Sequence, residues 1–265
     1  MTIRKKPHKL KNNNSSVNSL YANNPTQTHI DSNSHQNNFE KIMGYYTSLS
    51  SNGHPLMLDY AMPHTFVVTL AKIIINNLNS IKESCKNGFP DSFYDLCVTQ
   101  LYSESAFDKS IDNEMCIIYL KQCKSLLLHG QVFTVSKGKI IINDNEISDS
   151  DLYLKLYYSF WDKVPWEDIF PSDENAAKEL QYNKNILIDL LVKSENSIEV
   201  DRIANDFIEL TGISYKNDLF MISFIDFYFF TWMKHFGILS YSDKNEPLVT
   251  IHLTENGKKL LRLFQ

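Results

Sequence analysis

The chain has 265 residues, of which 43% are hydrophobic and 22% are charged. A chain of this size can bury a core without disulfides or metals, and its composition excludes a collagen, a small disulfide scaffold and a wholly disordered protein. The net charge is −5. Residues 1–38 carry five Lys and Arg against Asp31, a net of +4, which leaves −9 for the rest of the chain. An acidic body is not drawn to nucleic acid by bulk electrostatics.

The first 38 residues predict a disordered arm. Nine Asn lie between Asn12 and Asn38, and apolar residues are isolated, so ordering this tract would cost more entropy than burial returns. No apolar stretch follows the first cations, which argues against a secretory signal. The basic tip of the arm contains candidate nucleic-acid contacts at Arg4, Lys5, Lys6 and Lys9. A solvated tail is the alternative interpretation.

Residues 39–171 form the first predicted folded region. Apolar residues recur at helical spacing over 64–81, from Asp91 to Leu101, and from Asp112 to Leu128. His129-Gly130 ends the third helix. Two β-branched runs, 131–135 and 139–142, then flank a short turn with Gly138, which predicts a β-hairpin. A helical block over 149–170 follows, and the polar run from Pro171 to Asn175 predicts a boundary.

Residues 172–265 repeat this order. Helices are expected over 185–192, 197–210 and 219–236, with Gly212 and Gly237 as stops. Strands are expected over 238–241 and 248–253, and a last helix over 255–264. The predicted fold class is mainly α with small β-hairpins.

Three helices, a glycine and a hairpin are the plan of a winged helix, and the chain resembles it twice. The final Leu253-Thr254-Glu255-Asn256-Gly257-Lys258-Lys259-Leu260-Leu261 looks like the L-T-x-x-G-x-x-L-L ending of many winged-helix proteins. The corresponding Ile142-Asn143-Asp144-Asn145-Glu146 of the first copy lacks both the Thr and the Gly. Residues 100–265 are similar to uncharacterised bacterial proteins with tandem winged-helix-like modules, through a Ser103-Glu104 turn and a Tyr- and Trp-rich helix over 152–166. The resemblance implies a fold and carries no activity.

The third helix of the second module is unsuited to reading DNA. In that fold the third helix enters the major groove, where its side chains contact base edges and phosphates. The segment 219–236 carries one Lys, one Asp and no Arg, Asn or Gln, and it is apolar nearly all round. Such a helix is buried or forms a protein interface. Its charges also argue against a membrane span.

Other candidate nucleic-acid contacts lie outside that helix. Lys137 and Lys139 flank the tip of the first hairpin, and Lys258, Lys259 and Arg262 form a cluster in the last helix. A solvated turn and favourable placement in the C-terminal half of a helix are the alternatives.

Aromatic residues between 153 and 166 are the other candidate contact group. A base-stacking surface needs interleaved cations, and only Lys155 and Lys163 lie among them. Packing within the chain and an oligomer interface are the remaining interpretations. The candidate interface residues are Tyr153, Tyr157, Trp161 and Trp166.

The sequence offers no pattern for catalysis. It contains neither a GxGxxG nor a GxxxxGK[ST] phosphate loop, and neither HExxH nor GxSxG. The four Cys show no metal-ligand spacing and predict apolar residues in a reducing cytoplasm. We therefore expect a cytoplasmic, non-enzymatic protein without a cofactor or membrane partner, which binds a protein or itself. A DNA-binding transcriptional regulator is the alternative.

Overall fold

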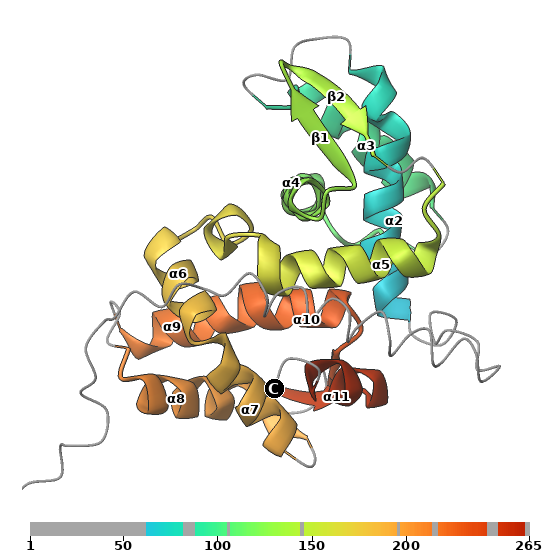
Figure 1. The fold of residues 1–265 in the computed structure, drawn as a ribbon. Coiled ribbons are helices and arrows are strands. Elements are labelled where there is room, and N and C mark those ends of the chain that lie inside the picture. Colours follow the sequence, from blue (N-terminus) through green and yellow to red (C-terminus); the bar gives the residue numbers. More distant parts are fainter. Residues whose placement is uncertain are drawn as a thin grey trace, which may run out of the picture.

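The computed structural model describes residues 62–81, 88–104, 107–143, 146–194, 197–213, 217–242 and 249–262. These residues are mainly helical with two small antiparallel sheets, which confirms the predicted fold class at this level. The predicted arm over residues 1–38 lies outside the described residues. Figure 1 shows α5 and α10 running across the middle, with the β1–β2 hairpin above them and α7, α8 and α11 below.

The N-terminal part, which we define as α2 to η5, starts with three helices and a hairpin. Its elements are α2 (Met62–Asn77), the 3-10 turn η2 (Leu78–Ser80), α3 (Asp91–Ser103), α4 (Asn113–His129), β1 (Phe133–Ser136), β2 (Lys139–Ile142), α5 (Asp149–Tyr158), the π-helix η4 (Ser159–Lys163) and the 3-10 turn η5 (Trp166–Asp168). Helix α4 begins where the Asp112 carboxylate accepts a hydrogen bond from the Met115 N–H at 2.8 Å. The first backbone N–H groups of a helix have no acceptor within the helix, so they need such a partner.

The predicted first hairpin is confirmed, with Phe133 opposite Ile142 and Ser136 opposite Lys139. Its loop consists of Lys137 and Gly138, with φ of 52° and 77°. Two successive positive φ values are typical of a type I′ turn, which suits the twist of a two-residue hairpin. Alternation places Phe133 in the core and leaves Ile141 about half exposed.

The C-terminal part, which we define as α6 to α11, has the same order with an additional helix, α6, and an additional strand, β3. Its elements are α6 (Glu174–Tyr182), α7 (Lys184–Lys193), β3 (Ile198–Glu199), α8 (Val200–Thr211), α9 (Asp218–Phe224), the π-helix η6 (Ile225–Phe230), α10 (Thr231–His235), β4 (Leu239–Tyr241), β5 (Thr250–Leu253) and α11 (Glu255–Arg262). The sheet order is β3-β5-β4, and Ile198 pairs with Ile251.

Two elements of the C-terminal part were not predicted. The polar run that suggested a boundary at Pro171 leads directly into α6, because the Asp173 carboxylate caps the Ala176 N–H at 3.1 Å. Ala176, Ala177 and Leu180 make the buried face of α6. The sequence pattern includes the residues of β3 in the helix expected over 197–210, because two residues are too few to show the alternation of a strand.

One hydrophobic core runs through both parts of the described chain. Its centre is aromatic, and Phe160, Trp166, Phe229 and Phe236 are fully buried. The Trp166 ring lies 5.6 Å from the Phe229 ring, and the Phe160 ring lies 5.4 Å from the Phe236 ring. Aromatic pairs at these separations stabilise a core beyond their buried area. The two parts are therefore held together by packing.

The L-T-x-x-G-x-x-L-L ending has a direct structural role. The Thr254 hydroxyl donates to the Gly237 carbonyl at 2.7 Å and accepts from the Gly257 N–H at 2.9 Å, so it caps α11 and ties it to the turn before β4. A Cβ on Gly257 would overlap the backbone carbonyl of Ile238. Leu260 and Leu261 are buried. The motif thus fixes α11 against the turn between α10 and β4.

Replacing Gly257 with alanine should lower the free energy of unfolding by about 3 kcal/mol, because the added methyl group meets backbone that cannot rotate away. The control is Gly212→Ala, where φ is 66° and a Cβ meets open space, so only about 1 kcal/mol of backbone strain is expected. Urea unfolding measures both. Equal losses in the two variants would contradict the close approach of α11 to Ile238.

Candidate functional site

The four aromatic residues predicted as an interface lie inside the protein. Tyr153, Tyr157, Trp161 and Trp166 are each no more than 1% exposed. The Tyr153 hydroxyl donates to the Phe236 carbonyl at 2.6 Å, and the Trp166 indole N–H donates to the Phe160 carbonyl at 2.9 Å. The interface prediction is therefore wrong for these residues. Packing within the chain, the other interpretation of the sequence, describes them, because their rings contact Phe229 of η6 and Phe236 after α10.

The continuous helical segment α9–η6–α10 is largely internal. Phe224, Tyr228 and Trp232 are between 1% and 9% exposed. The burial follows from contacts on several sides, since α8 packs on α9 and α2 packs on α10. The sequence-based expectation that this segment is buried is confirmed for these residues.

A strip on this segment does face solvent. Leu219 is 76% exposed and Phe227 is 50% exposed, and Ser223 between them is also exposed. Their spacing of four residues places them along one side of a helix. We call Leu219, Ser223 and Phe227 the apolar strip. It carries no cation that could contact a phosphate.

The third helices of the two parts meet through Gln122. This α4 side chain is buried, and its amide donates to the Ile169 carbonyl at 2.6 Å. Its carbonyl oxygen accepts from the indole N–H of Trp232 on α10 at 3.1 Å. Both ends of the amide are therefore satisfied inside the core, where an unpaired polar group would be costly. Gln122 fixes α4 and α10 relative to each other.

His235, at the end of α10, packs against α2 and α4. Its ring lies 4.4 Å from the Phe66 ring of α2 and 4.8 Å from the Tyr119 ring of α4. Its Nε2 atom is enclosed and has no hydrogen-bond partner among the described residues. Burial lowers the pKa of His235 to about 3, and the neighbouring Lys234 ammonium acts in the same direction. The imidazole is therefore neutral at physiological pH.

The candidate DNA contacts are not brought together. Lys137 and Lys139 are exposed on the β1–β2 hairpin, whereas Lys259 and Arg262 are exposed on α11. Figure 1 shows these two elements at opposite ends of the molecule. The Lys258 ammonium lies 3.2 Å from the Glu255 carboxylate. Arg4, Lys5, Lys6 and Lys9 lie outside the described residues.

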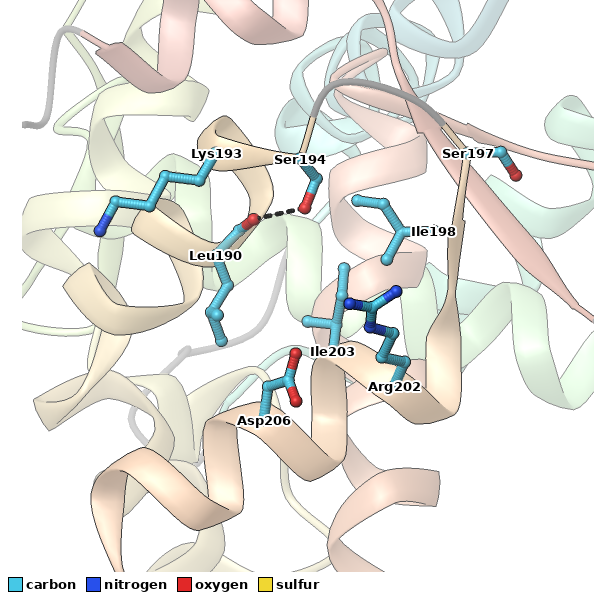
Figure 2. Close-up of a pocket in the computed structure, with 8 residues that line it drawn as sticks. All are labelled: Leu190, Lys193, Ser194, Ser197, Ile198, Arg202, Ile203 and Asp206. Carbon is cyan, nitrogen blue, oxygen red and sulfur yellow. Dashed lines mark hydrogen bonds between the residues drawn. The ribbon is translucent and has the colours of Figure 1, made fainter.

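A pocket of about 260 Å³ lies between α7 and α8. Its apolar lining comes from Leu190, Ile198 and Ile203, and its charged lining includes Arg202 and Asp206. Figure 2 shows both charged side chains on α8, one helical turn apart, facing the side of Leu190. Sequence analysis missed this pocket. The only sequence feature that pointed to it was the spacing of Arg202 and Asp206, four residues apart. That spacing indicates a pocket only once the position of α7 is known.

Two further observations concern metal binding and membrane spans in the described residues. They contain no group of three or more His, Cys, Asp or Glu side chains placed to hold a metal ion. None of the helices within the described ranges is both long and apolar enough to span a membrane.

No protein-family model matches this sequence, and comparisons with curated proteins and with solved structures gave no significant match.

Replacing Gln122 with leucine should destabilise the protein by about 3 kcal/mol, because the Trp232 N–H and the Ile169 carbonyl both lose a buried partner. In Gln122→Glu, a carboxylate still accepts from Trp232 but donates to Ile169 only when protonated. Urea unfolding should therefore show the Glu variant approaching wild-type stability as the pH falls, relative to the Leu variant. A Leu variant as stable as wild type would contradict the bridging role.

Below pH 6.5, stability should fall because of His235. The unfolded imidazole has a pKa near 6.5 and the folded one a pKa of about 3, so the unfolded chain binds the proton first. The contribution of His235 is complete above pH 6.5 and declines by up to about 1.4 kcal/mol for each unit down to pH 3. His235→Phe keeps an aromatic ring without a proton site. Chemical unfolding across this range should give a shallower pH dependence for the variant, and identical profiles would contradict the burial of a neutral imidazole.

Proposed function

We propose that this chain is a non-enzymatic binding protein built on two winged-helix-like modules, and that it binds another protein or a second copy of itself. Two features support the module assignment. In each part, helices are followed by a glycine and an antiparallel hairpin, at Gly130 and at Gly237. In the C-terminal part, β3 also pairs with β5, so the hairpin is joined to the strand that precedes α8.

The observation that carries the proposal is the packing of the third helices. A helix that reads bases must enter the major groove with polar side chains on its exposed face. Helices α4 and α10 instead contact each other through Gln122 and Trp232. These internal contacts of α4 and α10 support the proposal, as does the exposure of Leu219 and Phe227 on α9 and η6.

The apolar strip supplies the proposed contact surface. Exposed Leu and Phe side chains on a rigid helix stabilise a protein interface when they are buried by a partner. A helix held by the aromatic core loses little conformational freedom on binding. The partner that we test first is a second copy of this chain.

The alternative proposal is a DNA-binding regulator. It would use the basic arm together with the exposed Lys137 and Lys139 of the hairpin or the Lys259 and Arg262 of α11. Their separation to opposite ends of the molecule favours the protein-binding proposal.

A reducing compartment such as the cytoplasm is part of the proposal. Cys97, Cys116 and Cys123 are free and buried. Burial raises the pKa of the Cys97 thiol to about 12, and it raises the pKa of the Cys116 thiol as well. Such thiols are unreactive apolar residues that need no oxidising environment.

Self-association and DNA binding can be compared in one set of samples. In sedimentation velocity, the full chain should associate as its concentration rises. Leu219→Glu and Phe227→Glu should each weaken association by about tenfold or more, because they bury a charge in the interface. The control is Ile141→Glu, which alters an exposed apolar residue of the hairpin and should associate like wild type.

A titration of labelled random duplex at low and high salt tests the alternative. Phosphate contacts make affinity fall as salt rises. Salt-dependent binding that is lost in Lys137→Asn, a residue suited to the positive φ of this turn, would support the regulator. That result together with a monomer at all concentrations would overturn the protein-binding proposal.

A further inference from the structure

The pocket between α7 and α8 combines an apolar wall with two opposite charges. Leu190 of α7 and Ile203 of α8 contribute apolar side chains, and Ile203 is only 2% exposed. Arg202 and Asp206 lie at the same pocket. The remaining polar lining comes from Lys193, Ser194 and Ser197, so polar residues outnumber the apolar ones in this pocket. Its volume of about 260 Å³ suits a metabolite smaller than a nucleotide.

The two charges do not neutralise each other. Within the described residues, none of the ion pairs includes Arg202 or Asp206, although they lie one turn apart on α8. The other cation of the pocket, Lys193, pairs with Asp189 at 3.7 Å and extends away from Arg202 (Figure 2). Arg202 and Asp206 therefore present a positive and a negative site separated along the helix.

The position of Arg202 favours an anionic ligand group. Arg202 lies in the first turn of α8, where the helix dipole disfavours a cation. The N-cap residue Glu199 makes no side-chain hydrogen bond to the N–H groups of that turn. A carboxylate bound to the guanidinium would be stabilised by a charge-assisted contact. A cationic group near Asp206 would be stabilised by the carboxylate.

We infer that this pocket binds a free α-amino acid with an aliphatic side chain. The ligand carboxylate contacts Arg202, its ammonium contacts Asp206, and its side chain packs against Leu190 and Ile203. Each charged group of the ligand thus meets an opposite charge, and its apolar side chain meets apolar side chains. This inference is independent of the proposed protein-binding role, because the pocket residues are distinct from the apolar strip.

Isothermal titration of the full chain with L-leucine tests the inference. Two analogues each lack one charge: L-leucinamide has no carboxylate, and 4-methylpentanoate has no ammonium. L-leucine should bind saturably, and each analogue should bind about tenfold or more weakly, since each loses a charge-assisted contact. Arg202→Gln and Asp206→Asn should each weaken L-leucine binding to a similar degree.

Matched controls separate the pocket from a general charge effect. Arg262→Gln removes an arginine from α11, and Asp201→Asn removes an exposed carboxylate from the first turn of α8. Both should bind L-leucine like wild type, and circular dichroism should show that all four variants are folded. Methyl NMR shifts of Ile198 and Ile203 on adding L-leucine would locate the ligand.

Two outcomes would overturn the inference. One is the absence of both heat and methyl shifts with L-leucine. The other is binding of inorganic phosphate that depends on Arg202 and not on Asp206, together with equal affinity for L-leucine and 4-methylpentanoate. That second pattern would define a site for simple anions.

Discussion

The amide of Gln122 links the two parts of this protein by buried hydrogen bonds at their contact. It satisfies the indole N–H of Trp232 and the carbonyl of Ile169 at once, and the three groups come from α4, α10 and the turn after η5. Around this bridge, rings from both parts of the chain pack edge to face, including Phe160 with Phe236. Hydrogen bonding fixes the helices relative to each other, and the burial of apolar side chains supplies most of the stabilisation, because the buried polar groups are few.

This arrangement limits what the surface can do. Because α4 and α10 are joined through Gln122 and Trp232, part of each helix is used inside the molecule. The β1–β2 hairpin and α11, which carry exposed cations, lie at different ends of the molecule (Figure 1). The proposed role in protein binding relies on Leu219 and Phe227 because they are large apolar side chains on a helix that the core holds rigid.

The C-terminal part carries both proposed contact regions on neighbouring helices. The pocket uses Arg202 and Asp206 of α8, and the apolar strip uses α9 and η6, which follow it in the chain. Helix α8 packs against α7 on one side and against α9 on the other. A ligand between α7 and α8 would therefore contact the helix that supports the start of the strip, and both regions are fixed by the same core.

Local sequence patterns determined most of the elements. The Asp112 cap, the Lys137-Gly138 turn and the Thr254-x-x-Gly257 ending act over a few residues, so their structures follow from the chain itself. The burial of most of 219–236 followed from its composition. Tertiary structure alone decided that Tyr153 and Trp166 are internal, that two residues before α8 join the second sheet, and that Arg202 and Asp206 face a pocket. These features depend on contacts between residues far apart in sequence, such as Gln122 with Trp232. The spacing of apolar residues along a helix shows which of its faces is buried, but it does not show which element covers that face.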